Sequence, residues 1–414
     1  MKYYQRLDCR LCGSKNLFKQ MSLTATPPAD SYITQDNKGM MQESIPLDLY
    51  QCGDCGHTQL GHVIDAVEVY TNYLYETAST LGLGSHFKKC ANTVMKKFKP
   101  KKGGLVIDIG SNDGILLKYF KEHGMTILGV DPMPGIAEKA SSDGVPTLPD
   151  FFTEEFAEKL SDEKGYAAII SSNNLVADTD DLTPFIKGVK KLMDKESIFF
   201  FETFYFYLQV KNFVWDFTYH EHYSYFTIKP LKEYFLKHGM EIIDVEDNET
   251  KGGSMRVTLQ LTGGNRKIED SVDEHIKLEE IDGFQTKKPF IEYKNKIEAS
   301  KKEFRKFIDD LKVKKNSIVG YGASPTSTTL IYHFDMKDDL DYLVDDFEAK
   351  QGLLSPGYQI PVYPSSKISK EVPAYTIIIA WRYADKIIAN NQDYLNKGGK
   401  FIIPLPYPRI VEKK

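Results

Sequence analysis

Short apolar runs and amphipathic stretches follow one another in turn along the middle of the chain. From Gly104 onward, the runs at 105–110 (LVIDIG) and 126–130 (TILGV) predict buried strands. Between and after them, 115–123 and 135–141 carry apolar residues at helical spacing. Further strand signals follow at 167–170 (AAII) and 198–202 (IFFFE). This alternation is typical of βαβ units around a mostly parallel sheet.

Other patterns flank this central region. Residues 71–102 read as helix, with apolar positions near the helical period in 86–98, and 295–315 reads as a charged, solvated helix between domains. A second βα pattern then begins at 317–324 (SIVGYGAS) and continues through LDYLVDD, AYTIIIAW and KFIIPLP. We therefore predict three domains, at 1–70, 71–265 and 266–414.

Length and charge narrow the class of protein. At 414 residues the chain is long enough for two or three domains. Its net charge of −5 gives no reason to expect nucleic acid as a partner. No apolar run approaches the roughly 20 residues that span a bilayer, and the first residues, MKYYQRLDCRLCG, have no apolar leader segment. These features predict a soluble cytoplasmic protein without a membrane partner.

Four of the five cysteines form two C-x-x-C pairs, which is the spacing of a tetrahedral zinc site. A glycine follows each pair (Gly13 and Gly56) and suits a tight turn. Four protein ligands leave no open position, so the zinc is expected to be structural; redox motifs and unligated thiols are the alternatives. Cys90 stands alone and is expected to be an ordinary buried thiol. The predicted ligands are Cys9, Cys12, Cys52 and Cys55.

The segment VIDIGSNDG (106–114) predicts a ligand-binding turn between a strand and a helix. Glycines let backbone amides approach a ligand, and a helix N-terminus favours anionic groups. The spacing differs from G-x-G-x-x-G, but D-x-G-x-x-x-G is similar to the turn that holds S-adenosylmethionine (SAM) in class I methyltransferases. An acid that would bind ribose ends the next strand (Asp131). A generic α/β turn is the alternative. The candidate cofactor-binding residues are Asp108, Gly110, Ser111, Asn112, Gly114, Asp131, Pro132, Phe151 and Asn173.

Phe151 and Phe152 follow the third strand position, where one of them could contact adenine. Packing in the core is an equally good interpretation of both rings.

The segment 218–226 (TYHEHYSYF) holds the densest group of proton-transfer side chains. Read as a strand, it would place His220 and His222 on one face and Glu221 on the other. That arrangement favours acid–base catalysis over a metal site, and a strand with partly buried polar groups is the alternative. The phenols of Tyr73 and Tyr75 could approach the same cleft, although tyrosine-rich segments more often pack.

Taken in order, the motifs resemble the nucleotide-sugar C-methyltransferases of deoxysugar biosynthesis, which include the TDP-sugar 3-C-methyltransferases. The likeness spans nearly the whole chain: CRLCG, CGDCG, TPPADSY, VIDIGSNDG, GVDP, YHEHYSYF, GGSMR, VGYGAS, LVDD, KQG, SPG, IPVY, AWRYAD and GGKFIIPLP. The resemblance implies a zinc-binding N-terminal domain, a SAM-binding Rossmann-like class I methyltransferase domain, and a C-terminal Rossmann-like α/β domain that helps to hold the nucleotide. It also favours a monomer and a product used in surface polysaccharide or a glycosylated metabolite.

Enzymes of this family remove a proton next to the ketone of a nucleotide-linked keto-sugar and methylate the resulting enolate. The resemblance implies the same reaction for this chain. The resemblance implies His222 as the base, with Tyr219 and Glu221 orienting it or the sugar. It also implies that a tyrosine of the Tyr73/Tyr75 segment lies near the sulfonium and enolate. The segment 251–256 would lie near the sugar or its diphosphate.

Two positions depart from the family pattern. Where the family usually has N-x-x-A-H, with a His proposed to stabilise the enolate, this chain has Asp178. An ionised carboxylate accepts hydrogen bonds only and would repel an enolate. Either His220 supplies the donor, or Asp178 is protonated, or the chemistry differs. In addition, 323–328 (ASPTST) lacks the usual lysine. An O- or N-methyltransferase of a sugar nucleotide, and a non-catalytic sugar-nucleotide-binding protein, are the alternative functions.

Overall fold

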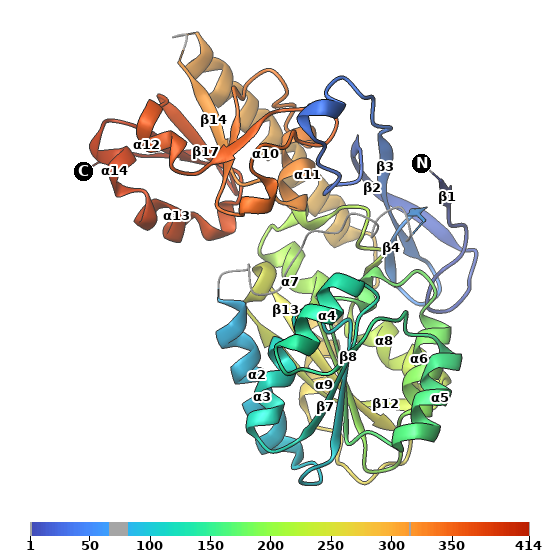
Figure 1. Cartoon of the computed structure of the whole chain (residues 1–414). Helices are drawn as coiled ribbons and strands as arrows, with labels where there is room; N and C mark the ends of the chain where they lie inside the picture. The colour runs from blue at the N-terminus through green and yellow to red at the C-terminus, as the bar shows by residue number, and fades with distance from the viewer. Residues whose placement is uncertain (1, 66–81, 314–315, 414) are drawn as a thin grey trace.

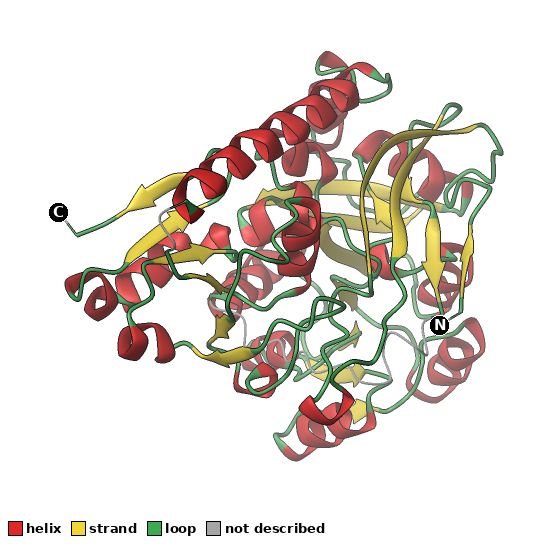
Figure 2. Cartoon of the chain, turned by 90° about the horizontal axis from the view of Figure 1, so that it is seen from above, coloured by secondary structure: helices red, strands yellow, loops and turns green. Residues whose placement is uncertain are grey.

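The structure is a computed structural model that describes residues 2–65, 82–313 and 316–413. Tyr73 and Tyr75 lie outside the described residues. The two termini lie on opposite sides of the molecule, and the N-terminal strands and the C-terminal domain sit side by side above the central sheet (Figures 1 and 2). Helix α11 (Pro325–His333) of the C-terminal domain contacts strand β2 (Leu17–Thr26) of the N-terminal domain directly.

The N-terminal domain is built from antiparallel strands that hold the two cysteine pairs. Four strands form a sheet in the order β11-β4-β3-β2, and β1 pairs with β5. Strand β11 comes from the central part of the chain, so this sheet also fixes a segment beyond residue 220. The elements are β1 (Tyr3–Gln5), β2 (Leu17–Thr26), η1 (Gln35–Asn37), β3 (Ile45–Cys52), β4 (Thr58–Leu60), β5 (His62–Ile64) and β11 (Ser224–Tyr225).

The central domain is a seven-stranded sheet in the order β12-β13-β10-β9-β6-β7-β8. Strands β10, β9, β6, β7 and β8 are parallel to one another, and β13 is antiparallel to both β10 and β12. Its strands are β6 (Leu105–Ile109), β7 (Thr126–Val130), β8 (Thr147–Leu148), β9 (Ile169–Asn173), β10 (Ile198–Phe204), β12 (Met240–Asn248) and β13 (Ser254–Leu261). This order agrees with the predicted class I methyltransferase fold.

Helices cover both faces of this sheet (Figure 1). They bury apolar faces against strands such as β10, which is buried along its whole length. The helices are α2 (Leu83–Phe98), α3 (Ile115–Glu122), α4 (Pro134–Ser142), α5 (Glu154–Lys164), η3 (Val176–Asp178), α6 (Leu182–Lys191), α7 (Phe206–Lys211), η4 (Trp215–Phe217), α8 (Ile228–Lys237), η5 (Thr250–Gly252) and α9 (Ser271–Ile281).

The C-terminal domain is a second βα sheet, in the order β16-β15-β14-β17-β18-β19 with only β19 antiparallel. Its strands are β14 (Ile318–Tyr321), β15 (Leu343–Asp345), β16 (Val362–Pro364), β17 (Tyr375–Ile378), β18 (Lys400–Ile403) and β19 (Arg409–Val411). Its helices are α11 (Pro325–His333), η6 (Glu348–Lys350), α12 (Lys367–Glu371), η7 (Trp381–Tyr383), α13 (Ala384–Asn390) and α14 (Gln392–Asn396).

Helix α10 (Lys288–Lys312) leads into this domain. We predicted a solvated connecting helix here, and the structure changes that description. One face is buried, with Phe290, Ile297 and Phe304 in the main core, while the opposite face carries exposed lysines. The high charge density of the sequence had masked this apolar stripe. Cys90 is fully buried, as expected.

Candidate active site

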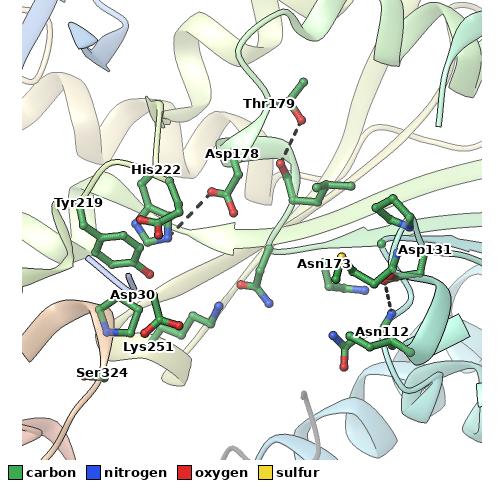
Figure 3. A pocket seen from close by; sticks show the side chains of 18 of the residues that line it. Asp30, Asn112, Asp131, Asn173, Asp178, Thr179, Tyr219, His222, Lys251 and Ser324 are labelled. Atoms are coloured by element: carbon green, nitrogen blue, oxygen red, sulfur yellow. Dashed lines mark hydrogen bonds and ion pairs between the residues drawn. The ribbon is translucent and has the colours of Figure 1, made fainter. Parts of the chain in front are cut away.

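All three domains contribute to one cavity of about 1530 Å³. It opens at the carboxyl ends of β6, β7 and β9, which is where ligands bind in open α/β sheets. Figure 3 shows two groups of side chains within it. Tyr219, His222, Asp178 and Lys251 lie on one side, and Asn173, Asp131 and Asn112 lie on the other.

The predicted SAM turn forms the second group. The Asp131 carboxylate accepts the backbone N–H of Asn112 at 2.9 Å and that of Met133 at 3.1 Å, which fixes both carboxylate oxygens at the end of β7. The Asp108 carboxylate accepts the Ser171 hydroxyl at 2.6 Å. Burial raises the pKa of Asp108 to about 7 and also raises that of Asp131. A cationic ligand would therefore favour the ionised forms of both acids.

The other residues predicted for this turn separate into two sets. Ser111, Pro132 and Asn173 line the cavity, as does Gly110, whose φ of +72° lies in the left-handed region. Gly114 does not line the cavity. It begins α3 at φ +71°, and a Cβ there would lie 2.6 Å from a methyl group of Val145, so its role is in packing.

The two phenylalanines after β8 have different surroundings. Phe151 is 57% exposed and lines the cavity, where an aromatic ring could cover a flat base. Phe152 also borders the cavity, but its ring packs edge-on against Phe156 and Phe185. Phe151 is therefore the better placed of the two for an adenine contact.

The segment 218–226 is a turn followed by the two-residue strand β11, and the predicted continuous strand is wrong. The N–H of His222 donates to the Tyr219 carbonyl at 3.1 Å, which closes the turn. Tyr219, Glu221 and His222 consequently line the cavity. His220 points the other way: its Nε2 lies 3.1 Å from the Ile45 carbonyl in the N-terminal domain. His220 is thus placed as a domain contact, and the expectation that it faces the reaction with His222 is corrected.

His222 is fully enclosed but keeps one ring nitrogen toward the cavity. Its Nδ1 lies 2.9 Å from the Phe217 carbonyl, so Nδ1 carries the proton and Nε2 the lone pair. Tyr219 packs against the ring with centroids 3.9 Å apart. Burial, reinforced by the positive charge of Lys251, lowers the His222 pKa to about 3. The imidazole is therefore neutral at physiological pH, with Nε2 unprotonated.

Two carboxyl groups accompany this ring. An oxygen of Asp178 lies 4.0 Å from His222 Nε2. Burial raises the pKa of Asp178 well above its usual range, and burial also raises that of Glu221 to about 7. Burial favours the protonated form of Asp178, which could donate a hydrogen bond, whereas the positive charge of Lys251 favours the carboxylate.

Lys251 is the candidate functional residue whose position the sequence predicted least well. It lines the cavity from η5, and burial lowers its pKa to about 8. From the sequence we expected the segment 251–256 near the sugar or its diphosphate. The left-handed φ of +54° at Lys251 sets the direction of its side chain, and the two glycines that follow are the one feature of the sequence that suggests it.

The C-terminal domain closes the cavity on the far side with ion pairs to the other domains. The Lys350 ammonium bonds to Asp30 of the N-terminal domain at 2.5 Å and to the Ala323 carbonyl at 2.8 Å. Arg382 bonds to the fully buried Asp216 at 3.0 Å. These contacts fix the position of the C-terminal domain, which forms the third wall of the cavity.

The four predicted zinc ligands meet at one point in the N-terminal domain. Their Sγ atoms all lie within 4.8 Å of one another, and the Cys9–Cys55 and Cys12–Cys52 sulfur pairs are each 3.6 Å apart. Four thiolates about 2.3 Å from a tetrahedral metal give similar spacings. Among the described residues this is the one cluster of at least three possible metal ligands, so the segment 218–226 forms none.

Three family models match successive parts of the chain. A methyltransferase domain model matches residues 85–245, and a C-methyltransferase C-terminal domain model matches 249–406. A zinc binding domain model matches 9–70. The chain thus matches, in this order, a zinc binding domain, a methyltransferase domain and a C-methyltransferase C-terminal domain, and these matches support a SAM-dependent C-methyltransferase. Its cofactors are SAM and a structural zinc ion, which Cys9, Cys12, Cys52 and Cys55 would hold.

One relative matches along the whole length: the C-methyltransferase NovU of Streptomyces niveus is 28% identical over 405 residues, covering 98% of this chain and 96% of that protein. Solved structures match less well. A SAM-dependent methyltransferase from Clostridium acetobutylicum is 13% identical with a TM-score of 0.35, covering 45% of this chain and 94% of its own. The magnesium protoporphyrin IX methyltransferase of Synechocystis with bound SAH is 12% identical with a TM-score of 0.35, covering 44% and 84%. Both are too remote to indicate a substrate. No helix among the described residues is long and apolar enough to cross a membrane.

Proposed function

We propose that this C-methyltransferase acts on a nucleotide-linked keto-sugar and methylates the carbon next to its ketone. The observation that carries the proposal is the position of His222: its Nε2 lone pair faces the cavity that the SAM turn also lines. A carbon acid is weak, so the reaction needs a base at that carbon and a donor for the enolate oxygen.

The residues divide the work as follows. His222 accepts the proton at Nε2 while the Phe217 carbonyl holds Nδ1–H and hence the tautomer. A carboxylate oxygen of Asp178, 4.0 Å from Nε2, would stabilise the imidazolium by its negative charge. When bound, SAM supplies the methyl group as an electrophile. Tyr219 packs on the imidazole and restricts its rotation.

The size and walls of the cavity support a substrate much larger than a simple ketone. About 1530 Å³ exceeds the 300–1,000 Å³ of a typical small-ligand site. The SAM turn lines one end, and residues of the C-terminal domain, including Tyr321, Ser324 and Asp346, line the other. A substrate with its sugar near His222 and its nucleotide near these polar groups would fill the cavity from one end to the other.

The test follows hydrogen at the reacting carbon. Candidate keto-sugar nucleotides are incubated with the protein in D₂O, with and without SAM, and products are analysed by mass spectrometry and NMR. We expect deuterium at the α-carbon and, with SAM, a carbon-bound methyl group. In His222→Gln the rates of deuterium exchange and of methyl transfer should both fall by about 10²–10⁴-fold, which is the usual contribution of a positioned base.

His123→Gln is the matched control, because His123 is exposed at the end of α3 and its side chain bonds to Asn92 on the surface. Full activity of His222→Gln would overturn the role of the base. An O- or N-methyl product would favour the alternative acceptor, and sugar-nucleotide binding without SAM binding would favour a non-catalytic protein.

A further inference from the structure

The turn 250–253 is built in a costly backbone conformation. Lys251, Gly252 and Gly253 have φ values of +54°, +84° and +130°. Glycine adopts such values readily, but a lysine in the left-handed region is strained unless its surroundings hold it. Strain of this kind concentrates at functional positions, and here it falls on the residue that reaches into the active-site cavity.

Helix α7 and the segment after it hold this turn in place. The buried Gln209 amide donates to the Gly253 carbonyl at 2.9 Å and to the Lys251 carbonyl at 3.3 Å. The Asn212 amide donates to the Gly252 carbonyl at 2.9 Å. Three successive carbonyls are thereby fixed, so the direction of the Lys251 side chain is set by the backbone.

The Lys251 ammonium lies within electrostatic range of the reacting groups. Burial is the largest influence on the pKa of Lys251, Asp178 and His222. In addition, the Lys251 charge acts to lower the pKa of Asp178 and His222, while Asp178 and Glu202 act to raise that of Lys251 and Arg382 acts to lower it. No hydrogen bond or ion pair within 4 Å engages the ammonium in the described parts of the chain. Figure 3 shows it on the same side of the cavity as His222, Asp178 and Tyr219.

We propose that the Lys251 ammonium is the donor that stabilises the enolate oxygen, in the role that the family usually gives to a histidine at the Asp178 position. The assignment rests on the proposed keto-sugar chemistry. His222 takes the α-proton, the C–H electrons form the new C=C bond, and the carbonyl π electrons move to the oxygen. Lys251 then donates a hydrogen bond to that oxygen without giving up its proton. When the α-carbon takes the methyl group, those electrons return and the ketone re-forms.

The proposal accounts for the carboxyl group at position 178. A carboxylate alone would repel an enolate, but beside an ammonium it becomes a counter-charge that holds the cation in place. A single positive donor in a buried site also stabilises developing negative charge more strongly than it would in water.

The test measures deuterium exchange at the α-carbon without SAM, so that proton removal is separated from methyl transfer. Lys251→Met should slow exchange at saturating substrate by about 10²–10³-fold, as loss of one oxyanion donor does. Lys251→Arg should retain more of the rate. The control is Lys302→Met, on the exposed face of α10. Calorimetry with SAM and with TDP or UDP alone checks that each variant folds and binds.

The pH profile gives a second readout that a merely structural role would not move. The groups facing Lys251 are Asp178, Glu202, Arg382 and His222. Because the pKa of Lys251 is about 8, wild-type exchange should fall above that pH, and Lys251→Arg should move the fall upward.

The possible results lead to different conclusions. If the wild type exchanges and Lys251→Met exchanges equally fast at saturation, the donor role is wrong. Loss of TDP or UDP affinity in Lys251→Met with a normal exchange rate would assign the lysine to the diphosphate instead. If the wild type exchanges no keto-sugar nucleotide while binding SAM, the proposed function fails and the donor role falls with it.

Discussion

At the scale of single residues, burial sets the charge state of the acids around the cavity. Asp108 is the clearest case: burial raises the pKa of its carboxyl group to about 7, although the Ser171 hydroxyl donates a hydrogen bond to it at 2.6 Å. An acid with a raised pKa in the folded state costs stability above that pKa, and the cost disappears as the pH falls toward the unfolded value near 3.8.

Asp108→Asn should therefore stabilise the free protein at pH 8, by at most about 3–4 kcal/mol from a shift of roughly three pH units. The gain should vanish near pH 4, because the wild-type carboxyl is then neutral as well. The same change should weaken SAM binding, since it removes a negative charge facing a cationic ligand. Thermal unfolding at both pH values, with and without SAM, measures the two effects. Equal stability of variant and wild type at pH 8 would contradict the prediction.

Residues also mark the limit of what the sequence could predict. The zinc ligands and the turn at 108–114 were predictable, because each consists of short motifs whose spacing is typical of one kind of site. His220 was misplaced because polar alternation resembles a strand, and only the hydrogen bond from His222 to Tyr219 reveals a turn. Lys251 lies 73 residues after Asp178, and no local pattern indicates that a strained turn brings the two together.

At the scale of elements, the zinc module supports the loop that carries Asp178. Arg10 lies between the paired ligands Cys9 and Cys12 and is buried. Its Nε bonds to Asp180 at 2.9 Å, and its NH1 bonds to the Leu60 carbonyl at 2.7 Å. Asp180 stands two residues after the end of η3. The turn that holds Cys9 and Cys12 is thus joined to the loop that carries Asp178 through a buried ion pair between Arg10 and Asp180.

Asp180→Asn should destabilise the protein by about 3–5 kcal/mol, because it leaves the buried Arg10 charge without its main partner. Replacing both residues, as Arg10→Met with Asp180→Asn, should recover part of that loss, since the desolvated charge is then gone. A double-mutant cycle by chemical denaturation measures the coupling. Strictly additive losses would show that the pair does not join the two elements. Zinc content measured for each variant separates this effect from loss of the metal.

At the scale of the whole molecule, the segment 218–226, which holds the proposed base His222, is fixed from both sides. After His222 the chain enters the N-terminal sheet as β11. Before it, Thr218 accepts the Thr329 hydroxyl of the C-terminal domain at 2.8 Å. The central sheet alone could carry the SAM turn, and its βα order was predictable from periodicity. The assembly of three domains around one cavity depends on buried polar contacts between distant segments, which periodicity does not encode.

Asp216 provides the sharpest test of that assembly. Its buried carboxylate accepts hydrogen bonds from Trp381 at 2.9 Å and from Arg382 at 3.0 Å. It thereby joins η4, just before the turn that carries His222, to the C-terminal domain. Asp216→Asn should leave the half-buried Arg382 charge poorly compensated and loosen this wall of the cavity. We expect KM for the sugar nucleotide to rise about tenfold or more, since one lost charge-assisted bond is worth about 1.5–3 kcal/mol. SAM affinity should be unchanged, because the SAM turn belongs to the central sheet. Asp385→Asn, at an exposed position of α13, is the control, and an equal loss of SAM affinity would show that the domains do not act as separate walls.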